Sequence, residues 1–196
     1  MVEFAILGLL HEAPMHGYEL RKRLASPLGA FRAFSYGSLY PALRRLLRAG
    51  LIVEETAEAT LDDTADAVEG KATRAAGRSW GRRARRVYKL TAEGKERFAA
   101  LVADGGPQTW DDDGFGVHMA FFSRTPAEVR MRILEGRRRR VEERREGLRA
   151  ALARAGEQID RYTRELHRLG LESSEREVRW LNELIEHERA EQDGLT

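Results

Sequence analysis

The segment from Ser35 to Val53 (SYGSLYPALRRLLRAGLIV) constrains the fold of this chain more than any other. Its large apolar residues recur at helical spacing, which predicts an α-helix with one buried stripe: Leu39, Leu43, Leu46 and Leu47. Gly50 ends this helix, and the apolar residues that follow begin a β-strand. Because a helix tolerates proline best in its first turn, Pro41 predicts that the helix is capped at Gly37 or Ser38.

The flanking segments predict the rest of one small domain. An apolar run over Glu3–His11 and an amphipathic stretch that begins at Gly17 predict two helices upstream. Downstream, Arg85–Thr91 (RRVYKLT) predicts a returning strand, and Thr91–Val102 predicts a helix capped by the threonine hydroxyl. The order helix, helix, helix, strand, strand, helix is that of a winged helix-turn-helix domain, in which the third helix and the hairpin bind DNA.

Charge is segregated along the same region, although the net charge of the chain is only +2. Residues 21–48 hold seven basic residues and no acidic one, residues 54–69 hold seven acids and no base, and residues 70–91 hold eight bases and no acid. The predicted second helix, recognition helix and returning strand all lie in positive blocks. This pattern favours a protein that displaces counterions from DNA.

Four motifs occur in a fixed order along residues 1–102: ILGLL (residues 6–10), HGYEL (16–20), GSLYPALRRLLRAGLI (37–52) and YKLTAEG (88–94). In this combination the sequence resembles the PadR family of bacterial transcriptional regulators. The resemblance implies a dimeric winged-helix repressor with a helical C-terminal dimerisation region.

The predicted DNA-binding residues form two groups. The recognition-helix group is expected at the major groove and the adjoining phosphates: Ser35, Tyr36, Ser38, Tyr40, Arg44 and Arg45. The wing group is expected at the phosphate backbone or the minor groove: Arg82, Arg83, Arg85, Arg86 and Lys89.

Residues 54–84 form an insert in the wing that is far longer than an ordinary hairpin loop. We interpret it as a mobile wing tip whose basic half follows phosphates and whose acidic half lowers non-specific binding. A disordered loop without a function is one alternative. The other is an anionic-nucleotide site, because Arg74, Arg78 and Arg82 recur every fourth residue beside Trp80.

We therefore expect three parts: a winged-helix domain over residues 1–103, a linker rich in glycine and acid over residues 104–125, and a helical region over residues 126–196. Heptad spacing predicts a nearly continuous helix from Pro126 to Leu169, and an S-x-x-E capping box at Ser174 opens a last helix. The predicted dimerisation residues are Leu148, Leu152, Ile159, Leu166 and Leu181. The basic run at residues 136–140 is interpreted as a helix face paired with nearby glutamates, rather than as a second DNA contact.

The sequence offers no enzyme motif. Its five histidines have no metal-ligand spacing, and it contains no cysteine, P-loop, HExxH or GxSxG sequence. Asp111–Asp113 lies in the predicted linker and is a weak metal candidate, so neither a metal nor a cofactor is expected. The lack of cysteine, of an export leader and of an apolar run of about 18 residues favours a cytoplasmic protein.

The fold class expected is mainly α with a small β-hairpin wing. The function expected is a sequence-specific DNA-binding repressor that binds a palindromic operator as a homodimer and responds to an effector. We expect a small planar aromatic effector near the dimer interface, bound by Phe121, Phe122, Tyr162 and Trp180. The alternative is a winged-helix module that binds protein. The positive blocks on both the helix and the wing favour DNA.

Overall fold

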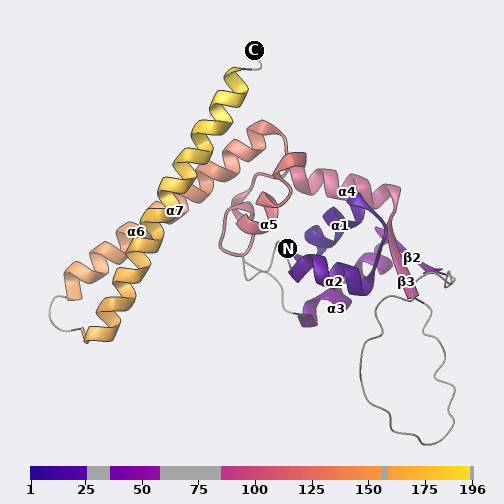
Figure 1. Ribbon diagram of the computed structural model, residues 1–196, viewed down its shortest axis with the longest axis horizontal. Helices are drawn as coiled ribbons and strands as arrows, with labels where there is room; N and C mark the ends of the chain where they lie inside the picture. Colours follow the sequence, from indigo (N-terminus) through magenta and orange to yellow (C-terminus); the bar gives the residue numbers. More distant parts are fainter. Residues whose placement is uncertain (26–35, 58–84, 156–158, 195–196) are drawn as a thin grey trace, which may run out of the picture.

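The computed structural model describes residues 1–25, 36–57, 85–155 and 159–194 (Figure 1). A small helical domain with a three-stranded sheet holds the N-terminal half, and a two-helix arm projects from it (Figure 1). The prediction of a mainly α chain with a β-hairpin wing is confirmed.

The N-terminal domain has the predicted element order. Its elements are α1 (Val2–Glu12), β1 (Met15–His16), α2 (Gly17–Ala25), α3 (Tyr36–Arg48), β2 (Ile52–Ala57), β3 (Arg85–Leu90) and α4 (Ala92–Ala103). The hairpin strands β2 and β3 pair antiparallel, and β1 adds a third strand on the other side of β3. A two-residue strand is too short to have a readable periodicity, so β1 was not predicted.

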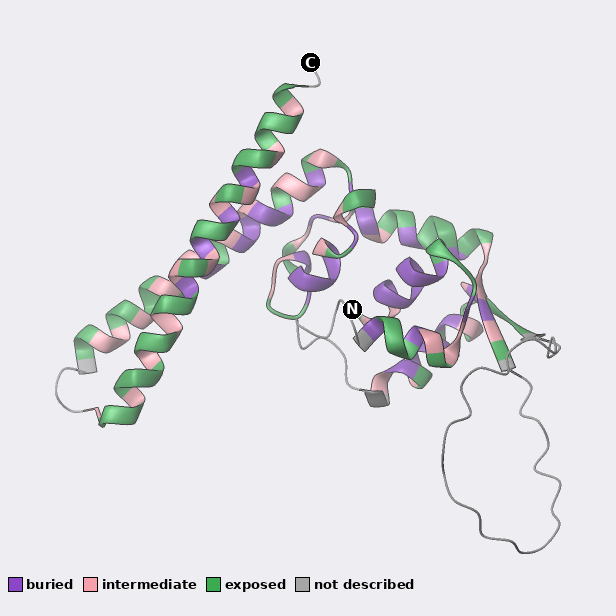
Figure 2. Ribbon diagram, in the orientation of Figure 1, coloured by how far each residue is buried: buried purple, intermediate pink, exposed green. Residues whose placement is uncertain are grey.

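Most of α1 is buried in the centre of this domain, which explains its almost unbroken apolar sequence (Figure 2). The fully buried Ile6 and Leu7 pack in one core with Leu20 of α2 and the apolar stripe of α3. The predicted stripe of α3 is confirmed, since Leu39, Leu43 and Leu46 are each at most 4% exposed. Burial of one face of α3 fixes which of its side chains meet solvent.

The prediction for the start of α3 was wrong, whereas the prediction for its end is confirmed. The helix begins at Tyr36, so Pro41 lies inside it and forgoes the hydrogen bond to the carbonyl of Gly37. At the other end Gly50 adopts φ 69°, in the left-handed region that favours glycine. Its N–H donates to the carbonyl of Leu47, and the next N–H donates to Leu46, which is the Schellman pattern.

Thr91 joins the end of α3 to the start of α4. Its hydroxyl donates to the carbonyl of Gly50 at 2.8 Å and accepts the N–H of Gly94 at 3.0 Å, which confirms the predicted cap. A Cβ atom on Gly94 would overlap the carbonyl oxygen of Leu51. The LTAEG sequence therefore packs the start of α4 closely against the turn that leads into the wing.

Residues 104–125, which we predicted to be a linker, are folded. They form η2 (Pro107–Thr109), α5 (Phe115–Met119) and η3 (Phe122–Arg124). The buried Val117 and Phe121 belong to the core of the winged-helix domain, whereas Phe115 belongs to the core of the arm. The composition of this segment suggested a linker, but the few apolar residues among its glycines and aspartates are buried in the two cores.

The arm consists of α6 (Ala127–Ala155) and α7 (Arg161–Asp193), which form an antiparallel hairpin (Figure 1). The predicted continuous helix to Leu169 was wrong, because Asp160 caps a new helix and accepts the N–H groups of Tyr162 and Thr163. The predicted helix start at Ser174 was also wrong. The Ser174 side chain instead donates to the carbonyl of Gly170 inside α7.

The apolar seam of the arm lies within one chain. Leu134 and Val141 of α6 pack with Val178, Leu181 and Ile185 of α7 in a separate core. Ion pairs cross between the same helices, including Arg130–Glu188 at 2.7 Å and Arg149–Glu175 at 3.0 Å. Among the described residues, no helix is long and apolar enough to span a bilayer.

Candidate nucleic-acid interface

The surface side of α3 carries a tyrosine and two arginines. Burial of the leucine stripe leaves Tyr40, Arg44 and Arg48 exposed. The Arg48 side chain reaches back to the carbonyl of Arg44 at 3.2 Å. No acidic residue occurs in the sequence of α3, so this face presents only donors and an aromatic ring to a ligand. Arg48 was not among the predicted contacts, although its place one turn after Arg44 was a usable signal.

Arg45 differs from its neighbour Arg44. Its guanidinium lies 2.5 Å from the carboxylate of Glu3 on α1. One helical residue rotates a side chain by about 100°, which turns Arg45 toward α1. The structure therefore keeps Arg44 on the open face and pairs Arg45 with an acid at the edge of the domain.

The pleat of the wing separates the predicted basic residues onto two faces. Arg86 lies on the same face as Tyr88, and its side chain pairs with Glu54 at 3.0 Å. Lys89 lies on the opposite face and pairs with Glu55 at 2.5 Å. The prediction treated these basic residues as one group, whereas alternation along the strand places Arg86 and Lys89 on opposite faces of the hairpin.

The face of the wing that carries Arg86 adjoins α3. Gly17 lies beside the rings of both Tyr88 and Tyr40, because a Cβ added there would lie 3.5 Å from the first and 3.9 Å from the second. Burial raises the pKa of Tyr88, and the Glu54 carboxylate raises it further. Tyr88 of the wing and Tyr40 of α3 thus both lie beside Gly17, and Arg86 lies on the same face of β3 as Tyr88.

Several predicted residues lie outside the described parts of the chain. These are Ser35, Arg82 and Arg83, together with the proposed nucleotide clamp in the wing insert, and nothing is described for the side chains of Tyr36 and Arg85. Ser38 is half-buried on α3. Strand β2 extends to Ala57, so the insert predicted at 54–84 begins later than expected.

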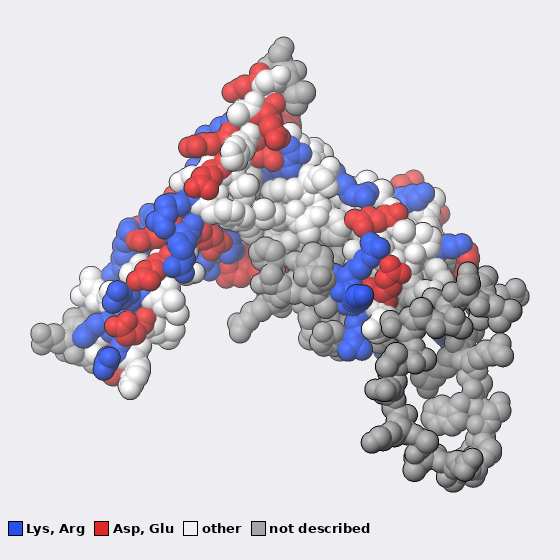
Figure 3. All heavy atoms as spheres, viewed as in Figure 1, with Lys and Arg blue, Asp and Glu red and all other residues white. Residues whose placement is uncertain are grey.

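Helix α2 adds two exposed residues that the sequence analysis did not assign. Tyr18 and Lys22 are one helical turn apart on the solvent side of α2. On the face that Figure 3 shows, basic and acidic side chains lie near one another on both the winged-helix domain and the arm.

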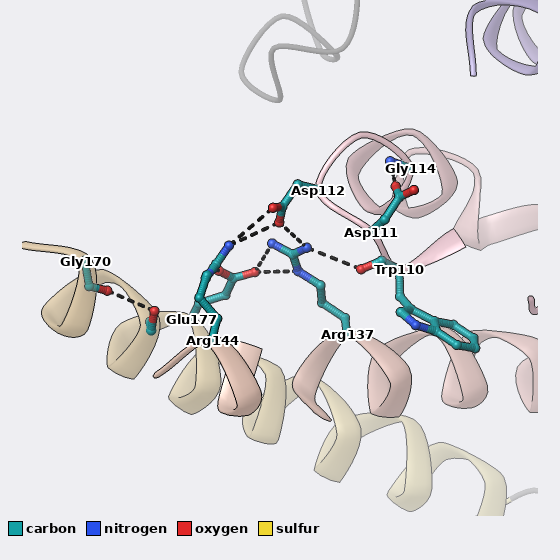
Figure 4. A network of polar contacts seen from close by, with 9 residues as sticks. Trp110, Asp111, Asp112, Gly114, Arg137, Arg144, Gly170 and Glu177 are labelled. Atoms are coloured by element: carbon teal, nitrogen blue, oxygen red, sulfur yellow. Dashed lines mark hydrogen bonds and ion pairs between the residues drawn. The ribbon is translucent and has the colours of Figure 1, made fainter. Parts of the chain in front are cut away.

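A second polar cluster lies where the folded segment 104–125 meets the arm (Figure 4). Arg137 of α6 is 7% exposed and donates to Glu177 of α7 at 2.6 Å, to Asp112 at 2.7 Å and to the carbonyl of Trp110 at 3.3 Å. Arg144 completes the cluster by pairing with both carboxylates. Burial raises the pKa of Asp112, but hydrogen bonds from Arg137 outweigh it and the net shift is downward.

This cluster changes the interpretation of the 136–140 run, which we expected to pair with glutamates on its own helix. Arg137 pairs across to α7 and to the preceding segment, and Arg138 donates to Asn182 at 3.2 Å. Arg139 and Arg140 are exposed. The described residues contain no group of acids and histidines that could hold a metal ion.

The four predicted effector residues do not lie together. Phe121 is buried in the core of the winged-helix domain, and Phe122 packs on the core of the arm. Tyr162 is exposed in the first turn of α7, whereas Trp180 contacts Phe115 edge to face at 6.2 Å. Helical spacing cannot show which aromatic residues of different elements converge, so the predicted common site is not formed within one chain.

Residues 6–65 match the family described as "Transcriptional regulator PadR-like family". Solved structures similar to the chain include Bacillus subtilis PadR in complex with operator DNA, with 19% identity, 95% of this chain and 98% of that chain covered, and a TM-score of 0.39. The same protein in complex with p-coumaric acid is 19% identical, with 96% of this chain and 99% of that chain covered and a TM-score of 0.41. A PadR-like transcriptional regulator from Bacillus cereus is 20% identical, with 97% of this chain and 99% of that chain covered and a TM-score of 0.40.

No curated protein sequence matches the chain. The match over residues 6–65 covers most of α1 together with β1, α2, α3 and β2, and it ends before β3, the second strand of the wing. The match to the family of PadR-like transcriptional regulators therefore lies in the N-terminal winged helix-turn-helix region of this chain, at residues 6–65.

Proposed function

We propose that this regulator is a repressor that binds a palindromic operator as a homodimer, in the cytoplasm. The observation that carries the proposal is the open face of α3, which exposes Tyr40, Arg44 and Arg48 and places Tyr40 beside Gly17 together with Tyr88 of the wing. In this proposal α3 enters the major groove, where Arg44 donates to a guanine edge. The wing follows the adjoining backbone.

The test begins with the purified protein and fragments of its own genome, from which the bound motif is recovered. Arg44→Ala is expected to weaken binding to that motif by about 1–3 kcal/mol and to relax the preference at one base pair, because a bidentate guanine contact is lost. Fluorescence anisotropy with matched and mismatched duplexes measures both effects.

Arg97→Ala is the matched control, since it removes the same charge from an exposed position on α4. A recognition role requires a base-specific loss in Arg44→Ala and only a small, sequence-independent loss in the control. Equal losses in both variants, with unchanged base preference, would contradict the assignment of α3.

A second apolar stripe on α7 supports the homodimer. The first stripe packs on α6, but Leu166 and Leu169 are 66% and 58% exposed, and Tyr162 and Trp180 lie on the same side of the helix. Leu181, which we predicted as a dimer contact, is instead 0% exposed within its own chain. Leu148, Leu152 and Ile159 are only partly buried, so they remain candidates at the same end of the arm.

The stripe predicts the effect of charge on assembly. Leu166→Glu combined with Leu169→Glu is expected to give monomers at micromolar concentration and to weaken operator binding strongly, because two carboxylates would lose solvation in a dimer. Light scattering measures the mass. Arg179→Glu, which changes the net charge by the same amount on another exposed face of α7, is expected to stay dimeric. Monomeric wild type would refute the dimer.

Effector control is the remaining part of the proposal. Of the four predicted aromatic residues, Trp180 is both partly exposed and next to the segment that joins the two folded parts. A planar ligand that binds there can release DNA only if it binds the two dimer geometries unequally. Its binding is expected to change Trp180 emission, read as the difference between wild type and Trp180→Phe. Release of DNA without that change would exclude this location.

A further inference from the structure

We propose that Glu54 limits non-specific DNA binding, because its carboxylate neutralises Arg86 and so weakens the contact between the wing and the phosphate backbone. The inference rests on the proposed DNA-binding function. It concerns a carboxylate on the face of the wing that adjoins the recognition helix.

The position of Glu54 follows from the strand register. Glu54 lies opposite Tyr88, and Arg86 is two residues before Tyr88 in β3, on the same face. The carboxylate holds the Arg86 guanidinium at 3.0 Å and 3.1 Å. The Arg86 side chain is 65% exposed and that of Glu54 only 28%, so the guanidinium is the outer partner. An approaching phosphate meets an arginine that already has a counterion.

This arrangement opposes the contact on which non-specific binding depends. Non-specific binding depends almost entirely on free cations that displace counterions. Arg86 can bind a phosphate only by sharing or leaving the Glu54 carboxylate, which also repels the phosphate. Specific binding has an additional source of free energy in the base contacts of α3, so it still takes place when the wing contact is weakened.

The neighbouring residue provides an internal comparison. Glu55 pairs with Lys89 in the same hairpin, but this pair lies on the face that points away from Tyr88 and the recognition helix. Glu54→Gln and Glu55→Gln therefore remove the same charge from adjacent residues on opposite faces.

The experiment measures binding of full-length wild type, Glu54→Gln and Glu55→Gln to a fluorescent duplex of random sequence over a series of KCl concentrations. Glu54→Gln is expected to raise the affinity about three- to tenfold at low salt and to steepen the salt dependence by about one released counterion. Glu55→Gln is expected to change the affinity by less than about twofold. In an Arg86→Ala background, Glu54→Gln is expected to lose most of its gain, because the residue it releases is absent.

Equal gains in Glu54→Gln and Glu55→Gln would overturn the inference, since net charge alone would then explain them. An unchanged or lower affinity in Glu54→Gln would also overturn it, because the carboxylate would then only position Arg86. Failure of the wild type to bind any duplex, random or genomic, is a different result and refutes the proposed function itself. Circular dichroism melts of all variants confirm that each one is folded when it is assayed.

Discussion

Replacing Arg137 with alanine is expected to lower the free energy of unfolding by about 3 kcal/mol. Removal of one partner from a buried ion pair leaves the other charge without compensation, which typically costs 3–5 kcal/mol. The lower end applies here because Arg144 still pairs with Glu177 and Asp112. The guanidinium also lies 5.3 Å from the centre of the Phe115 ring, so its loss removes packing as well as charge.

Urea unfolding followed by circular dichroism measures this effect. Arg137→Lys is expected to recover only part of the lost stability, because a point charge cannot reach Glu177, Asp112 and the Trp110 carbonyl together as the planar fork does. Arg139→Ala is the control, since this exposed neighbour should change the stability by less than about 0.5 kcal/mol. A similar small loss in Arg137→Ala would show that the cluster contributes little to the fold.

The protein is expected to lose about 2 kcal/mol of stability between pH 7 and pH 5 because of His118 alone. The residue is 5% exposed, and burial lowers the pKa of its imidazole from 6.5 to about 4. Phe4 packs at 4.5 Å from the ring, while Asp104, Asp111 and the N-terminus are the charged groups that act on it. The carboxylates raise the pKa, but desolvation outweighs them.

The sign follows from proton binding. Above pH 6.5 His118 is neutral in both states, so the folded protein has its full stability. Between pH 6.5 and about 4 the unfolded chain binds a proton that the folded chain does not, and stability falls. The measurement is the urea midpoint at several pH values for wild type and His118→Phe, which keeps a ring against Phe4. If the stability of the wild type fell with pH no more steeply than that of His118→Phe, His118 would not be the cause of the loss.

The effects expected for Arg137→Ala and for protonation of His118 both involve segment 104–125. Segment 104–125 gives Phe121 and His118 to the winged-helix side and Phe115 and Asp112 to the arm. Because both cores include residues from one short segment, changes in its packing affect the winged-helix domain and the arm together.

The sequence by itself determined the winged-helix domain. Its signals are local: the leucine spacing and Gly50 define α3, and Thr91 defines the start of α4. Local signals depend on hydrogen bonds and side-chain periodicity within about one or two helical turns, so they can be read without knowledge of the rest of the fold.

Only the tertiary structure decided how the distant parts combine. Leu134 and Val141 of the heptad pattern pack on α7 of the same chain, whereas Leu166 stays exposed, because apolar spacing does not state which helix supplies the partner. Composition could not show that a segment rich in glycine and acid is packed between two cores. The pairing of Arg45 with Glu3, and of Arg86 with Glu54, depends on register and on contacts between residues 42 and 32 positions apart in the sequence. Long-range contacts of this kind have no signature in the local sequence, so charge counts alone assigned every arginine near the wing to DNA.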